Sequence, residues 1–154
     1  MPIETPQAGA TWDKPSITLT PGLADPRVDQ DNIARSICIP GYTRSVRPPS
    51  SYTSELKRTQ LDDPRRGYSD RDPRDFEEDH FIPLEVGGDP QSEANLWPEH
   101  WSEPMGARTK DRLENELHRR VCLPNTDPEW LSLKAAQAEI VRDWIVAYSR
   151  YLGQ

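Results

Sequence analysis

Asp79 and His80 are adjacent in the stretch FEEDHFIPLEVGGDPQSEANLW, which spans residues 76–97. An imidazole can act as a general base that activates water, and a carboxylate can hold a divalent ion; phosphodiester hydrolysis uses both. Neighbouring residues of a strand face opposite sides, so the two side chains can serve one site only if the chain is bent or bulged there. Pro83, shortly after the pair, favours such irregularity.

The residues around this pair predict two short strands joined by a tight turn. Residues 80–86, HFIPLEV, have the composition of a strand. Gly87 and Gly88 follow, and they offer the positive backbone φ angles that a tight hairpin turn requires. A second short strand is expected over residues 95–97.

Three helices are expected to flank this hairpin. A short helix is predicted over residues 51–61. Residues 106–121 carry one apolar stripe at spacings of four, formed by Leu113, Leu117 and Val121. Residues 132–152 begin at Ser132, a favourable N-cap, and their apolar face comprises Leu133, Ala136, Ile140, Trp144, Ile145 and Tyr148.

The composition of the chain indicates one small domain with long loops. Its 154 residues include 16 prolines, and only 34% are hydrophobic, which limits regular structure because proline removes backbone donors. Five of the prolines fall in residues 1–30, where we expect an extended or disordered arm; the ordered domain is expected over residues 31–154. The formal net charge of −7 argues against indiscriminate nucleic-acid binding.

Two cysteines, Cys38 and Cys122, flank the central motif. A disulfide between them would close a large loop and stabilise the fold by a few kcal/mol. Two buried free thiols are the alternative, because sequence spacing does not give the distance between the sulfur atoms.

Three segments together resemble a known family: EDHFIPLEVGG, then NLW, then GARTKDRLEN. They are similar to the HNH nucleases, the ββα-metal superfamily, and especially to a bacterial branch with the pattern DHLIPLELGG, NLWP, KDRLEN and VC. The upstream segment ICIPGYTRSVRPPSSYTSELK is also similar to that branch. The resemblance covers roughly residues 37–151 and leaves the N-terminal arm outside it.

The resemblance implies roles for individual residues. His80 matches the general base of the family, and Asp79 matches a position that often holds a metal ligand. Asn95 matches the middle Asn, whose side chain braces the loop and orients the base. The third family position is a His or Asn near the start of the helix, whereas Gly106, Ala107 and Arg108 stand here. The zinc-binding cysteine pairs of many members are absent too.

The missing ligand has several candidates in the sequence. His100 and Glu103 precede the helix, and Asp111 lies on it; we prefer Asp111. Asp111, Glu114 and His118 share one helical face at spacings of three and four. Oxygen ligands favour Mg²⁺ or Mn²⁺, whereas a site that includes His100 or His118 could take Zn²⁺ or Ni²⁺.

Nucleic-acid contacts are expected from basic residues of the same helix, namely Arg108, Lys110 and Arg112. Residues 44–66 and 108–120 each carry a positive excess and could line a groove on the otherwise acidic protein. The alternative for Lys110 is a helix-surface pair with Glu114. For Glu77 and Glu78 two interpretations remain: they are either solvated acidic residues or part of the site.

These observations predict an α+β fold with a small ββα-metal core, a loop-rich N-terminal half and a C-terminal helix. The resemblance implies a metal-dependent endonuclease that hydrolyses DNA, with RNA as the other candidate substrate and His80 as the base. The alternative is a domain of this fold without a working metal site, which binds nucleic acid or a protein. A protein partner or inhibitor is compatible with either.

The sequence as given favours a soluble protein of bacterial or phage type. No run of about 18 apolar residues is present, and the polar start MPIETPQAGATWDKP lacks the hydrophobic centre of a signal peptide. A cytoplasmic location, or export by another route as for a delivered toxin nuclease, is therefore expected.

Overall fold

A computed structural model describes residues 14–101 and 104–153. They form one two-stranded antiparallel sheet, β1 (Phe76–His80) and β2 (Leu96–His100). The α-helices are α1 (Tyr42–Val46), α2 (Ser50–Asp62), α3 (Ala107–Val121) and α4 (Leu133–Leu152). Short 3-10 turns occur at Ile33–Arg35, Pro73–Asp75, Leu84–Val86 and Glu93–Asn95. Helices and an antiparallel sheet together are compatible with the expected α+β class.

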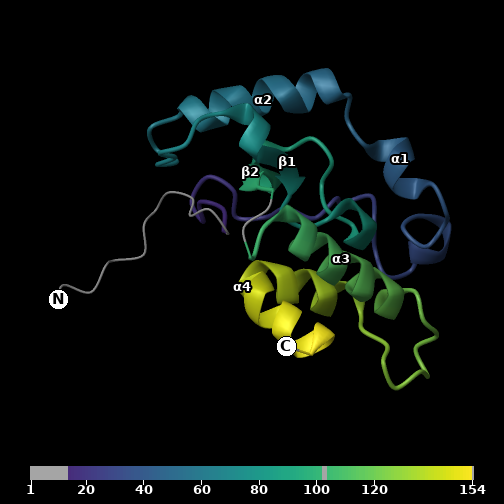
Figure 1. The fold of residues 1–154 in the computed structure, drawn as a ribbon. Coiled ribbons are helices and arrows are strands. Elements are labelled where there is room, and N and C mark those ends of the chain that lie inside the picture. Colours follow the sequence, from purple (N-terminus) through teal and green to yellow (C-terminus); the bar gives the residue numbers. More distant parts are fainter. Residues whose placement is uncertain (1–13, 102–103, 154) are drawn as a thin grey trace.

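The elements are stacked in layers around the sheet. Figure 1 shows β1 and β2 between α2 on one side and α3 on the other, with α4 packed against α3. None of the helices in the described residues is both long and apolar enough to cross a membrane.

The main core lies between α3 and α4. The predicted stripe of α3, Leu113, Leu117 and Val121, is fully buried, and it packs with Ile140 and Trp144 of α4. Burying one such large side chain contributes about 1.5–3 kcal/mol. The three predicted helices are therefore confirmed, with ends that differ by only a residue or two from those expected.

Helix α4 departs from the expected continuous helix at one residue. Asp143 has φ −173° and ψ 98°, which are not helical angles. Its side-chain oxygen accepts hydrogen bonds from the backbone N–H groups of Ile145 and Val146, so it caps the second half of the helix. Lys14 holds the same carboxylate at 3.0 Å.

The prediction of a strand over residues 80–86 is wrong. Strand β1 ends at His80, and the following residues form bends and a 3-10 turn. Pro83 has no N–H to donate to a ladder, and the backbone of Ile82 bonds to the side chain of Asn95 instead of to a strand. The apolar residues of this loop are nevertheless buried, so their composition indicated burial rather than a strand.

The expected hairpin turn at Gly87 and Gly88 is also wrong. Gly87 has φ 81° and ends the 3-10 turn, so its positive angle serves a different purpose. Gly88 donates to the Pro83 carbonyl, and a Cβ there would lie 1.7 Å from the Ile82 carbonyl oxygen. The second strand, β2, starts one residue after the predicted start and extends to His100.

The described part of the N-terminal arm is not a free lead-in. Thr20 donates its hydroxyl hydrogen to the Leu96 carbonyl, and Ala24 forms a bridge with Gly88. Asp25 and Val28 are buried. The ordered domain therefore includes residues 14–30, against the predicted boundary at residue 31; residues 1–13 lie outside the described part.

The two cysteines are bonded. Cys38 and Cys122 form a disulfide with Cα atoms 5.7 Å apart, which closes a loop across 84 positions. It ties the C-terminal end of α3 to the segment before α1. The alternative of two free thiols is therefore wrong.

Candidate active site

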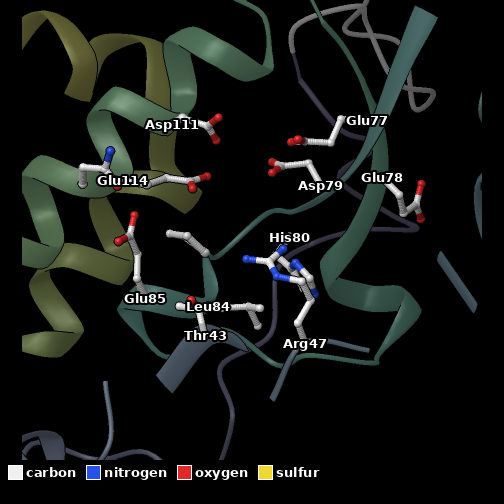
Figure 2. A pocket seen from close by; sticks show the side chains of 12 residues that line it. Thr43, Arg47, Glu77, Glu78, Asp79, His80, Leu84, Glu85, Asp111 and Glu114 are labelled. Carbon is white, nitrogen blue, oxygen red and sulfur yellow. The ribbon is translucent and has the colours of Figure 1, made fainter. Parts of the chain in front are cut away.

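A cavity of about 430 Å³ opens between β1, α3 and the loop that follows β1. Figure 2 shows carboxylates of Glu77 and Asp79 from β1 facing those of Asp111 and Glu114 from α3. His80 and Arg47 lie at the same cavity. The expected base and the two expected metal ligands are thus brought to one place.

His80 reaches the cavity because β1 ends there. Strand alternation alone would turn His80 away from the side of Asp79. The chain bends immediately afterwards, where Phe81 and Ile82 are held by the backbone and side chain of Asn95. Both side chains therefore line one cavity, as the predicted irregularity required.

The environment of His80 fixes its protonation. Its Nε2 lies 2.9 Å from the Pro90 carbonyl oxygen, which can only accept, so Nε2 carries a hydrogen. Burial lowers the pKa of the imidazole, and the Pro90 hydrogen bond and the charge of Asp79 offset only part of this effect. At neutral pH the ring is uncharged, and the lone pair of Nδ1 has no hydrogen-bond partner among the described residues.

Asn95 is fully buried and holds the loop between the two strands. Its Oδ1 accepts from the backbone N–H groups of Leu23 and Ile82, and its Nδ2 donates to the carbonyls of Ile82 and Asp89. All its hydrogen-bonding capacity is directed at the backbone. Asn95 is therefore a positioning residue that fixes the ends of the loop carrying Pro90, the partner of His80.

Lys110 is the central cation of the site, and its side chain has no exposed surface. Its Nζ lies 2.7 Å from Glu114 Oε2 and donates to the His80 carbonyl oxygen at 3.0 Å. Asp79 Oδ2 lies 2.9 Å from Nζ, close enough for an ion pair although not aligned for a hydrogen bond. A buried ammonium keeps its charge only where such partners surround it.

The surrounding carboxyl groups have raised pKa values. Burial, followed by the charges of Asp79 and Asp111, raises the pKa of Glu77 to about 8. Burial also raises the pKa of Asp111 and raises that of Glu114 well above its ordinary range. Several acids so close together need either protons or cations before they can coexist.

Two groups of carboxylates among the described residues have ligand geometry for a metal ion. One joins Asp79 of β1 to Asp111 and Glu114 of α3 (the helix-side triad). The other joins Glu77 and Asp79 to Glu99 of β2 (the sheet-side triad). Within each group, one oxygen from every residue lies within 4.8 Å of the others.

The other ligand candidates lie elsewhere. His100 packs edge-on against Phe76, with ring centroids 5.3 Å apart, on the opposite side of the sheet. His118 Nε2 lies 2.8 Å from the Ile37 carbonyl oxygen. Among the described residues, neither histidine belongs to a group with ligand geometry for a metal ion, so the expected Zn²⁺ or Ni²⁺ site with one of them as a ligand gains no support there. Glu103 lies outside the described residues.

The basic residues expected to touch nucleic acid do not line this cavity. Arg108 is exposed, with its guanidinium 6.0 Å from the ring of Trp101, and Arg112 is exposed over Tyr148 at 5.5 Å. Lys110 is buried, so its predicted phosphate contact does not fit this placement. Its predicted alternative, the pair with Glu114, is present, although in the interior rather than on the surface.

Arg47 and Glu99 are the site residues that the sequence did not single out. Arg47 follows α1 and is the one cation with exposed surface among the described residues that line the cavity. The sequence signal for Arg47 was its position in RSVRPP, a part of the upstream segment that resembles the family. Glu99 becomes part of the site only because β2 pairs with β1, so no local sequence pattern identifies it.

Comparison of the chain with protein-family models, curated proteins and solved structures gave no match. The functional assignment therefore depends on the geometry of the site and on the sequence motif.

Proposed function

We propose that this protein is a metal-dependent endonuclease of HNH type that hydrolyses phosphodiester bonds of DNA. One observation carries the proposal: an uncharged His80 borders the same cavity as a cluster of carboxylates able to hold a divalent ion. A base for water and a cation for the phosphate are the two requirements of this hydrolysis.

His80 acts as the general base. Because the Pro90 carbonyl keeps the hydrogen on Nε2, the free lone pair on Nδ1 can take a proton from water. The lowered pKa keeps this nitrogen unprotonated at neutral pH. Asn95 supports the base indirectly, since it fixes the loop that carries Pro90.

The helix-side triad fits a hard divalent ion. Asp79, Asp111 and Glu114 offer carboxylate oxygens, which suit Mg²⁺ or Mn²⁺. When bound, such an ion neutralises charge on the phosphate and on the leaving oxygen. Arg47 at the cavity wall can hold a second phosphate oxygen through its planar guanidinium.

A second candidate function is a domain of the same fold that binds nucleic acid or a protein without cleaving. The ammonium of Lys110 favours this candidate, because it already pairs with Asp79 and Glu114 of the helix-side triad. A metal ion there must share these carboxylates with the lysine.

Cleavage assays separate the two candidates. The purified chain should cut plasmid DNA with Mg²⁺ or Mn²⁺; a chelator should abolish cleavage, and added metal should restore it. Asp79→Asn should remove activity. Asp31→Asn, which alters an exposed aspartate far from Asp79 in the sequence, should not. Circular dichroism checks that both variants are folded.

A different experimental result would favour the binding module. The folded chain would bind DNA, yet it would cut no single-stranded or double-stranded DNA and no RNA with Mg²⁺, Mn²⁺, Zn²⁺ or Ni²⁺. A folded chain that neither binds nor cuts any of these nucleic acids would contradict both nucleic-acid candidates.

A further inference from the structure

The α3-facing side of the sheet carries three acidic residues. Glu77 and Asp79 lie two positions apart on β1, so their side chains share one face. The strand register places Glu99 of β2 directly opposite Glu77. Like charges directly opposite each other destabilise a sheet, so this face is poorly suited to packing alone.

Glu99 is the least expected member of this group. Its exposed fraction is 0%, and neither of its carboxylate oxygens has a hydrogen-bond partner among the described residues. A buried carboxylate without a partner is strongly unfavourable unless a proton or a cation compensates its charge. One of its oxygens lies within 4.8 Å of oxygens of both Glu77 and Asp79, so the group is aimed at them.

The charges around Lys110 leave room for more than one cation. The helix-side and sheet-side triads share Asp79 and contain five carboxylates in total. Lys110 contributes the only ammonium at their centre among the described residues. Five ionised carboxylates around one ammonium leave four negative charges, which two divalent cations balance.

We propose that Glu77, Asp79 and Glu99 form a second divalent-cation site, separate from the helix-side triad. Each carboxylate has two oxygens, so Asp79 can contact both sites. Glu77 and Asp79 line the cavity and give the ion its entry, while Glu99 behind them is the inner ligand. Paired ions stabilise both the attacking and the leaving oxygen in phosphoryl chemistry. This inference rests on the proposed function only in assuming that the helix-side triad also binds an ion.

A proton is the competing explanation. If Glu99 is permanently protonated, it donates a hydrogen bond to a neighbouring carboxylate and no ion enters the sheet-side triad. Glu99→Gln separates the explanations, because an amide keeps the shape and the donor of a neutral acid but supplies no negative charge to a cation. Glu77→Gln, at the cavity surface, tests the same site without altering the deeper interior.

The experiment is a titration of the full chain with MnCl₂ in the absence of nucleic acid, followed by calorimetry and by the electron paramagnetic resonance of free and bound Mn²⁺. The wild-type chain should bind two ions and give a spin-coupled signal. Glu99→Gln and Glu77→Gln should each lose one ion and the coupled signal. Asp111→Asn should lose the other ion and keep one.

Glu78→Gln is the matched control. Glu78 is a half-buried residue of the same strand that also lines the cavity, and neither of its carboxylate oxygens has a hydrogen-bond partner among the described residues. Its carboxylate points away from Glu77 and Asp79 (Figure 2). This variant should keep two ions. Thermal melts confirm that each variant is folded.

One bound ion in the wild-type chain, or an unchanged stoichiometry in both Glu77→Gln and Glu99→Gln, overturns the proposal. Loss of one ion in Glu78→Gln as well overturns the assignment of the site to this face. Two ions that respond as expected in a chain without nuclease activity would support the sheet-side site and contradict only the proposed function.

Discussion

The two faces of the β1–β2 sheet differ in the kind of side chains that they bury. On the face toward α2, Phe76 packs with Leu61 and Tyr68, and side chains of α2 donate to the carbonyls of the strands: Lys57 to Phe76 and Gln60 to Leu96. On the face toward α3, Glu77, Asp79 and Glu99 gather around Lys110.

Both faces are largely buried, but only the α3 face gathers several carboxylates close enough to share one cation. The α2 face has an aromatic contact between Tyr68 and Phe76 and a hydrogen bond from Tyr68 to Pro98. Each face has one carboxylate without hydrogen-bond partners among the described residues, Glu78 on the α2 face and Glu99 on the α3 face, but only Glu99 lies beside two further carboxylates. Natural proteins keep such locally unfavourable arrangements mainly at functional sites. Burial alone therefore does not distinguish a core from a site; the gathering of several carboxylates around one ammonium does.

The largest expected effect is a difference in DNA cleavage between substitutions of the two histidines at the ends of the paired strands. His80→Ala should lower the kcat/KM of plasmid cleavage by roughly 10²- to 10⁴-fold, the range for loss of a general base. His100→Ala, on the α2 face against Phe76, should retain cleavage. Equal losses in folded His80→Ala and His100→Ala proteins would break the distinction between the faces.

A pair of lysine substitutions should separate the faces by stability. Lys110→Met leaves Asp79 and Glu114 without their cation and should lower the free energy of unfolding by about 3–5 kcal/mol. Lys57→Met removes one hydrogen bond to the Phe76 carbonyl on the α2 face and should cost about 1 kcal/mol. Urea unfolding at pH 8 measures both, and similar losses would contradict the central role of Lys110.

The pH dependence of stability follows from the acids of the α3 face. The pKa of Glu77 is about 8 in the folded chain, and those of Glu99 and Glu114 are also raised, chiefly by burial. The folded chain therefore holds protons that the unfolded chain releases above the ordinary value of 4.5. Stability should fall as pH rises from about 5 to 8 without divalent ions.

His80 acts in the opposite sense, because its lowered pKa favours folding as pH rises toward its ordinary value of 6.5. One histidine is outweighed by the several raised acids. Thermal melts should show a midpoint a few degrees lower at pH 8 than at pH 5, and Mn²⁺ should restore most of the difference. A midpoint that rises steadily to pH 8 in the absence of metal would contradict the charge balance described for this face.

The smallest expected effect belongs to the α2 face. Tyr68→Phe removes the hydrogen bond to the Pro98 carbonyl, at 2.6 Å, and should cost about 1 kcal/mol of stability. Cleavage and Mn²⁺ stoichiometry should not change, because the ring still packs against Phe76. A loss of metal binding in this variant would show that the two faces are coupled.

Sequence periodicity was sufficient to predict α3 and α4, but it predicted neither α1 nor the break of α4 at Asp143. Residues repeating every three or four positions define the buried side of α3 and α4, and Ser132 accepts the N-cap hydrogen bond from Ala135. The motif likewise identified Asp79, His80 and Asn95, and the structure places all three at or around one cavity. The helices depend on contacts within a few residues of each other, so a short segment contains the information needed.

The burial of Lys110 follows from its position in the sequence. It lies three and seven positions before Leu113 and Leu117, so it falls on the buried stripe of α3. Its neighbour on that stripe, Glu114, is also buried. The pair could have been predicted as an internal ion pair from helical spacing alone.

Strand register, the loop after β1 and the cysteine pairing were decided by tertiary structure. Glu99 joins the site because β2 pairs with β1 in one register, and a shift by one residue would turn its side chain to the other face. The apolar residues after His80 are buried in a loop because Asn95, thirteen positions beyond Ile82, supplies hydrogen bonds that a strand would have made. Pairing between distant segments is set by the free energy of the whole assembled core, and no local pattern of residues contains it.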